Sequence, residues 1–258
     1  MTLVIDIGNT NIVCGVYKNE VLIWHSRFKT DRLRTSDEYY AMFKSLMGDV
    51  WHSDFVERIA LASVVPEMTR LFQHMFQKYF SAKLFVVNGY SPLGLTFDVS
   101  DPGFIGADLI ANAYAAFKLY KCNCIIVDLG TATTIQLLSS EGMFLGAVIA
   151  PGIRTGSSEL FEKAAQLSEI ELTCPTKTLG TNTKDAMLSG IVKGHALMIE
   201  SFINEIKREY SVLNPFKVIA TGGISDLIST LIPSLDVLNK TLTLDGLYLA
   251  TLALDKSN

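Results

Sequence analysis

Two Asp-x-Gly turns at matching positions constrain the fold of this chain more than any other sequence feature. The first is Asp6-Ile7-Gly8 and the second is Asp128-Leu129-Gly130, and each follows a short apolar segment. The two Asp residues are 122 positions apart, and the same spacing separates Glu20 from Gly142 in the next turn of each half. The recurrence of both turns in one register indicates a duplicated unit.

Hydrophobic periodicity predicts the same order of elements in both halves, which is three strands followed by alternating helices and strands. The chain is therefore expected to be an α/β protein with two domains, residues 1–120 and 121–258. Expected strands are 3–5, 12–17, 21–28, 58–65, 84–87, 125–127, 134–138, 143–150 and 217–220. Expected helices start at the Thr35–Glu38 capping box and at Pro66, and cover about 106–120, 157–165, 183–209, 225–231 and 244–254, with a loop at 88–103.

Composition and charge disfavour a nucleic-acid partner, a membrane span and a zinc site. Hydrophobic residues are 49% of the 258 residues and charged residues are 19%, which suits a large core. The formal net charge is −4 and Lys and Arg form no cluster, so nucleic acid is not expected as a partner. The apolar segment Leu145–Ile153 is too short to cross a membrane, and the N-terminus has no basic signal region, so a cytoplasmic protein is expected. The four cysteines have no zinc-ligand spacing and are expected to be ordinary thiols.

The segment Asp6–Asn11 has the chemistry of a phosphate-binding turn. Gly8 allows backbone N–H groups to approach phosphate oxygens, and Asn9 and Thr10 add side-chain donors. Asp6 can hold Mg²⁺ through a water molecule, since Mg²⁺ keeps several waters in proteins. A plain hairpin turn would use similar residues, but the repetition at Asp128 favours two turns that together bind one nucleotide.

Other features allow more than one interpretation. The chain contains neither a P-loop, nor a Rossmann glycine motif, nor a serine-hydrolase elbow. Thr221-Gly222-Gly223 follows a strand and could pass close to a nucleoside, or could be a simple strand-to-helix turn. Asp108 is either a functional carboxylate or a residue favoured by the helix dipole. Gly190 and Gly194 lie on one face of an expected helix, which suggests close packing within the chain or against a second subunit.

Taken in order along the chain, these motifs resemble those of type III pantothenate kinase, a family of the actin-like ATPase superfamily. The resemblance covers nearly the whole sequence. The motifs that carry it are Asp6–Val13, Thr35–Tyr39, Gly106–Asp108, Asp128–Thr134, Gly146–Ile153, Asn182-Thr183 and Thr221–Gly223.

The resemblance implies duplicated ribonuclease H-like (actin-like) domains, each a mixed sheet flanked by helices. It also implies that ATP phosphorylates pantothenate to 4'-phosphopantothenate, the first step of coenzyme A biosynthesis. The partners would be ATP with Mg²⁺, pantothenate, a monovalent cation (K⁺ or NH₄⁺) and a second copy of the chain, with neither nucleic acid nor membrane.

The resemblance further implies roles for individual residues. Asp108 would accept the proton of the pantothenate hydroxyl, Asp128 would bind the monovalent cation, and Asp6 would hold Mg²⁺ through water. The ATP-binding residues would be Asp6, Ile7, Gly8, Asn9, Thr10, Asn11, Ile12, Val13 and Thr131. The residues that bind pantothenate would be Gly106, Ala107, Asp108, Leu109 and Thr183.

The chain departs from the family pattern on the acceptor side. Leu109 replaces an arginine, Val99 stands where tyrosine is frequent, and Thr181 stands where many members have arginine. Leucine cannot bind a carboxylate as arginine does. Three alternatives follow: Arg154 substitutes for the missing arginine, the carboxylate is bound weakly, or a relative of pantothenate is the acceptor. The alternative function is a nucleotide-binding regulator with a degenerate acceptor site.

Overall fold

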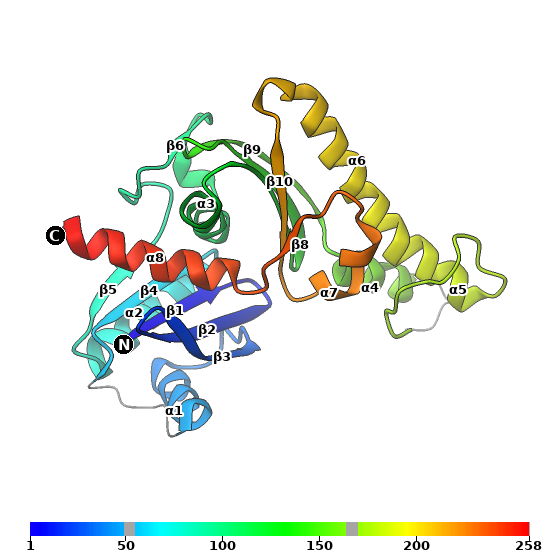
Figure 1. The fold of residues 1–258 in the computed structure, drawn as a ribbon. Coiled ribbons are helices and arrows are strands. Elements are labelled where there is room, and N and C mark those ends of the chain that lie inside the picture. Colours follow the sequence, from blue (N-terminus) through cyan, green and yellow to red (C-terminus); the bar gives the residue numbers. More distant parts are fainter. Residues whose placement is uncertain (49–54, 164–169, 258) are drawn as a thin grey trace. The chain divides into compact units, whose positions relative to one another are not determined.

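The computed structural model of the protein describes residues 1–48, 55–163 and 170–257, which form two compact units (Figure 1). The first unit contains Met1–Leu95, Val99–Leu119 and Leu242–Asn258, and the second contains Thr96–Asp98 and Tyr120–Thr241. The domain border expected between residues 120 and 121 lies next to the break at Leu119, but the C-terminal segment groups with the first unit.

The first unit contains a five-stranded mixed sheet in the order β3-β2-β1-β4-β5. β1, β2 and β3 form an antiparallel meander, and β4 and β5 continue the sheet in parallel with β1. The strands are β1 (Thr2–Ile7), β2 (Asn11–Lys18), β3 (Val21–Lys29), β4 (Arg58–Ser63) and β5 (Lys83–Val86).

One face of this sheet packs against two helices, α1 (Ser36–Met47) and α2 (Pro66–Tyr79). Alternate β1 residues, including Leu3 and Ile5, share this core with aromatic residues of both helices. The capping box between Thr35 and Glu38 starts α1 as expected, because the Thr35 hydroxyl accepts the Glu38 N–H while the Glu38 carboxylate accepts the Thr35 N–H.

The opposite face is covered by α8 (Leu242–Ser257), which contacts β1 and β4. A Cβ placed on Gly15 would lie 3.2 Å from Leu244 and 3.4 Å from Val4, so these residues meet on the α8 side of the sheet. α3 (Ala107–Tyr120) in turn packs on α8, where the Thr243 hydroxyl donates to Asn112 Oδ1 at 2.8 Å.

The second unit contains a six-stranded sheet in the order β11-β10-β7-β8-β9-β6. β7, β8 and β9 repeat the antiparallel meander, while β10 pairs in parallel with β7 and β6 pairs in parallel with β9. The strands are β6 (Thr96–Phe97), β7 (Asn123–Leu129), β8 (Ala132–Leu138), β9 (Met143–Pro151), β10 (Phe216–Thr221) and β11 (Val237–Leu238).

The core of the second unit lies between its sheet and its helices. Buried Ile125 and Val127 of β7 belong to one cluster with Ile199 and Ile203 of α6. The helices of this unit are α4 (Ile153–Lys163), α5 (Thr183–Leu188), α6 (Gly194–Glu209) and α7 (Ser225–Ile228). A π-helical turn, Ser189–Lys193, joins α5 to α6.

Both expected meanders are confirmed, and the differences from the sequence-based prediction are local. The expected single helix 183–209 contains the π-helical turn, and α4 starts four residues before the expected Ser157, with residues 164 and 165 outside the described part. The two-residue strands β6 and β11 were not predicted, because two residues carry no alternation pattern.

Within the described residues, the segment Thr183–Glu209 is the one helical stretch long and apolar enough to cross a membrane. One-third of its most apolar window, 33%, is buried inside the protein. Core helices of soluble proteins pass the same test, so this observation is weak evidence for a membrane span.

Gly246 of α8 provides a test of the helix packing in the first unit. A Cβ at this position would lie 2.0 Å from the backbone oxygen of Ala111 in α3. Gly246→Ala is therefore expected to lower the free energy of unfolding by about 1–3 kcal/mol, measured by chemical denaturation, because backbone cannot yield as a flexible side chain does.

Gly156→Ala is the matched control, because a Cβ on Gly156 in α4 meets nothing within 4 Å. Alanine should there stabilise the helix by up to about 1 kcal/mol. Equal stability of Gly246→Ala and the wild-type protein would contradict the close approach of α3 and α8.

Candidate functional site

The segment Asp6–Asn11, expected to bind phosphate and called the first phosphate turn below, joins β1 to β2. A hydrogen bond from the Gly8 N–H to the Asn11 oxygen closes it at 2.9 Å. Thr30, which follows β3, holds the turn from outside. Its hydroxyl donates to the Gly8 oxygen at 2.7 Å, and its N–H donates to the Thr10 oxygen at 2.9 Å. Asn9 and Thr10 are exposed at the tip. A ligand can therefore reach a turn whose backbone is already fixed.

Asp6 lies near the end of β1, paired in register with Val13 of β2. Side chains two residues apart on a strand share a face, so Asp6 lies on the same face as Val4, which is the α8 side. α3, which carries Asp108, packs on α8 in the same unit. The first unit thus places Asp6 and Asp108 on one side of its sheet.

Asp108 is the second residue of α3 and is half-buried. Its Oδ1 accepts the Leu109 N–H at 2.9 Å. Burial raises the pKa of the Asp108 carboxyl above its ordinary value, because the charged form loses hydration, and the backbone hydrogen bonds offset this only in part. A carboxyl with a raised pKa is a stronger base, and therefore a better proton acceptor, than an ordinary aspartate.

The second expected phosphate turn, at Asp128–Thr131, joins β7 to β8. It is held by the start of α4. The Thr131 oxygen accepts two hydrogen bonds, from the Gly152 N–H at 3.0 Å and from the Thr155 hydroxyl at 2.7 Å. Thr131 itself is exposed. In this hairpin Leu129 pairs with Thr133, whereas in the first hairpin Ile7 pairs with Ile12, so the second turn is one residue shorter.

Asp128 lies beside the glycine turn that follows β10. A Cβ on Gly222 would lie 2.7 Å from Asp128 Oδ1 and 2.6 Å from the Leu129 backbone, and Gly222 has a φ of +96°. Both the close approach and the positive φ require glycine. The Thr221–Gly223 motif therefore packs directly against the second phosphate turn.

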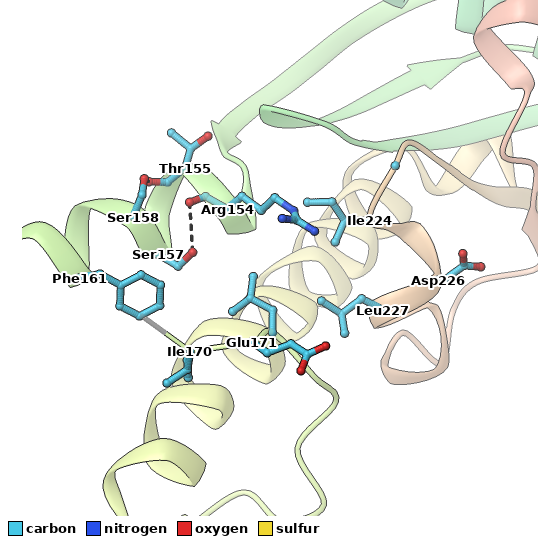
Figure 2. Close-up of a pocket in the computed structure, with 12 residues that line it drawn as sticks. Arg154, Thr155, Ser157, Ser158, Phe161, Ile170, Glu171, Ile224, Asp226 and Leu227 are labelled. Carbon is cyan, nitrogen blue, oxygen red and sulfur yellow. Dashed lines mark hydrogen bonds between the residues drawn. The ribbon is translucent and has the colours of Figure 1, made fainter. Parts of the chain in front are cut away.

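A pocket of ≈ 980 Å³ lies between α4 and α7 in the second unit. Figure 2 shows the side chain of Arg154 extending toward Ile224, with Phe161 and Leu227 on other walls. Its lining also includes Gly223, next to Gly222, and Thr155, which bonds to Thr131. The pocket thus adjoins the second phosphate turn, and its lining combines apolar side chains with hydroxyl and charged groups.

His195 supports the second turn from α6. Its Nε2 lies 2.8 Å from the hydroxyl of Thr133, which is buried on β8. Burial lowers the pKa of His195 below its ordinary value, because the charged ring would lose hydration. Sequence reasoning missed this contact, because 62 residues separate the two partners.

Thr183 begins α5 and is exposed, and Asn182 caps this helix by accepting the Asp185 N–H. Thr183 belongs to the second unit, together with Asp128 and Thr131. The residues from Asp6 to Val13 and from Gly106 to Leu109 belong to the first unit. In the segment from Gly106 to Leu109, Ala107 and Leu109 are buried and contribute to the packing of α3.

The donor set suits magnesium that arrives with a nucleotide. Among the described residues no group of three His, Cys, Asp or Glu side chains could form a metal site by itself. Asp6 is a single carboxylate beside a phosphate turn, which fits the preference of Mg²⁺ for one or two carboxylates plus phosphate oxygens and water.

Each unit has a three-stranded meander with a turn at the end of its first strand. This arrangement places the protein in the class with an actin-like α/β fold. A glucokinase of the ROK family from Streptomyces griseus, solved with glucose and AMPPNP, is similar with a TM-score of 0.59 at 13% identity, covering 97% of this chain and 98% of that one. A Baf family transcriptional activator from Campylobacter jejuni is similar with a TM-score of 0.64 at 19% identity, covering 98% and 99%. At these identities the similarity establishes the fold alone.

The sequence relatives are more specific. The model of the type III pantothenate kinase family matches residues 2–205. A type III pantothenate kinase of Exiguobacterium sibiricum is 40% identical over 248 residues, covering 96% of this chain and 97% of the relative. One of Halalkalibacterium halodurans is 40% identical over 250 residues, covering 96% and 98%. The chain belongs to the type III pantothenate kinase family.

Gly106 leaves room for the Asp108 carboxylate. A Cβ at Gly106 would lie 2.4 Å from Asp108 Oδ1, so Gly106→Ala must displace the carboxylate. If Asp108 acts on the acceptor hydroxyl, as the resemblance implies, phosphoryl transfer should fall about 100-fold, because a misplacement of about 1 Å can have that effect. Steady-state kinetics measure this loss.

Nucleotide binding, measured by calorimetry, and the melting temperature serve as controls for Gly106→Ala. Both should remain near the wild-type values, because the first phosphate turn is formed by other residues. Unchanged turnover in this variant would refute the positional role of Gly106.

Proposed function

We propose that this protein transfers the terminal phosphoryl group of ATP to the primary hydroxyl of pantothenate, which yields 4'-phosphopantothenate and ADP. This is the first step of coenzyme A biosynthesis. Family membership over most of the chain supports the reaction. The observation that carries the assignment at the site is the half-buried Asp108 with its raised pKa, on the same side of the sheet as the Asp6 turn.

In the proposed mechanism Asp108 orients the pantothenate hydroxyl and accepts its proton. The hydroxyl oxygen forms a bond to the terminal phosphorus, the bond from that phosphorus to the bridging oxygen breaks, and ADP leaves with the electron pair. Because the transition state is loose, orientation contributes more than complete deprotonation before attack. Backbone N–H groups of the turn around Gly8 offer hydrogen bonds to phosphate oxygens.

Two cations belong to the proposal. Asp6 would hold Mg²⁺ through water, and Mg²⁺ would supply charge neutralisation on the phosphates. Asp128 would bind a monovalent cation, K⁺ or NH₄⁺. The backbone oxygen of Leu129 and Oδ1 of Asp128 both lie near Gly222 and support this assignment, since carbonyl and carboxylate oxygens suit such ions.

The protein is further proposed to act in the cytoplasm as a homodimer. A Cβ on Gly190 would meet nothing within 4 Å in the chain, and Leu197 and Phe202 on α6 are exposed apolar residues. A second copy packed on this helix would cover them. Light scattering tests this point, and a monomeric mass at micromolar concentration would reject it.

A coupled assay of ADP formation tests the proposed reaction. The purified protein should phosphorylate pantothenate in the presence of Mg²⁺ and K⁺, and replacement of K⁺ by Na⁺ should reduce the rate. Asp108→Asn should lower turnover by at least about 100-fold, because the proton acceptor is lost. Binding of ATP should remain near the wild-type affinity.

The pH profile gives an independent readout in the same assay. Asp108 acts as its carboxylate, so activity should fall as pH decreases through its raised pKa, at a pH above the ordinary aspartate value of about 3.9. Absence of transfer to pantothenate at high substrate would reject the kinase and favour a nucleotide-binding regulator. Full activity of Asp108→Asn would reject the proton-acceptor role.

Leu109→Arg tests the acceptor side. Leu109 is 8% exposed, so an arginine stem can replace its packing while the guanidinium extends toward the surface. If pantothenate is the acceptor, its KM should fall several-fold because a carboxylate partner is restored. Leu109→Met, of similar volume, is the control and should leave KM unchanged. A KM that rises in Leu109→Arg with unchanged stability would show that the acceptor is gripped elsewhere.

A further inference from the structure

The loop between β3 and α1 places an arginine beside the first phosphate turn. Arg32 Nη2 donates to Asn9 Oδ1 at 3.4 Å. Two residues earlier, Thr30 makes its two hydrogen bonds to Gly8 and Thr10. The loop and the turn therefore form one hydrogen-bonded structure within the first unit.

The base of this loop is fixed on both sides of Arg32. The Tyr39 hydroxyl, buried in the core, donates to the Asp31 oxygen at 2.9 Å and accepts the Asp31 N–H at 2.9 Å. Asp31 also accepts the Leu33 N–H at 3.0 Å. The capping box at Thr35 fixes the other end. The backbone of Arg32 is thus held in place while its side chain is exposed.

The charge on Arg32 is available to a ligand. The neighbouring carboxylate, Asp31, forms an ion pair with Arg34 at 3.3 Å instead. Within the described part of the chain no carboxylate lies within ion-pair distance of Arg32. The segment Gly8–Asn11, by contrast, presents only neutral donors.

A triphosphate is bound more strongly by charged donors than by neutral donors. It carries several negative charges, and the transferring group retains charge on its three outer oxygens in the transition state. A guanidinium offers two parallel N–H groups that match two phosphate oxygens, and such charge-assisted bonds are about twice as strong as neutral ones. Asn9 would orient this group through its amide oxygen.

We propose that Arg32 is a catalytic residue that contacts the terminal phosphates of ATP at the first turn. This inference rests on the proposed kinase function. The guanidinium binds ATP in preference to nucleotides with fewer phosphates, and it stabilises the charge of the transferring phosphoryl group.

The test compares Arg32→Gln with Arg34→Gln in the full-length protein. Both variants remove one positive charge from the same loop, but Arg34 faces Asp31 and Met42 rather than the turn. Arg32→Gln should lower kcat/KM for ATP about 100-fold, as expected for one lost donor to a transition-state charge. The KM for pantothenate should remain unchanged, Arg34→Gln should stay within about threefold of wild type, and Arg32→Lys should recover part of the loss.

Calorimetry with ATP, ADP and AMP separates this inference from the proposed reaction, because binding requires no acceptor. The affinity of Arg32→Gln should fall for ATP and stay unchanged for AMP. An inactive wild-type protein would reject the kinase, and the binding series would still decide the role of Arg32. Retention of wild-type kcat/KM and ATP affinity by Arg32→Gln, or equal losses in both glutamine variants, would overturn the proposal.

Discussion

The second unit depends on one constraint, which is the close approach of glycine backbone to the second phosphate turn. Gly222 lies against Leu129 and the Asp128 carboxylate, and a Cβ on Gly152 would lie 2.4 Å from the Gly130 oxygen. No larger residue fits either position, so β10 and α4 can meet the end of β7 only through glycine. The first turn is fixed differently, by the side chain and backbone of Thr30. Two turns at matching positions of their sheets are thus supported by different contacts.

The order of the elements and the position of both phosphate turns could be predicted from the sequence. The constant spacing of 122 residues between Asp6 and Asp128 reflects two real meanders, and the capping box at Thr35 marks the start of α1. Local signals of this kind succeed because strand alternation, turn residues and caps each depend on neighbours in the chain. Pro66 likewise marks the start of α2, as expected.

Features that depend on distant partners could not be predicted in this way. Three such features are the packing of α8 on β1, the contact of His195 with Thr133, and the position of Arg32 beside Asn9. Each brings together segments that are far apart in the sequence or loops that have no sequence pattern. The raised pKa of Asp108 also needs three-dimensional burial, since its position in the sequence shows only a carboxylate near a helix start. The sequence therefore predicts which groups perform chemistry, and the structure adds the neighbours that hold those groups in place.

The grouping of α8 with the first unit has a consequence for biosynthesis. The ribosome makes the sheet of the first unit early, but the helix that covers its α8 face is encoded after the whole second unit. During translation, Val4 and Gly15 therefore lack their final cover until residues 242–257 have left the exit tunnel. The nascent first unit must remain incomplete while the second is synthesised, so its aggregation-prone interval lasts almost as long as the synthesis of the chain.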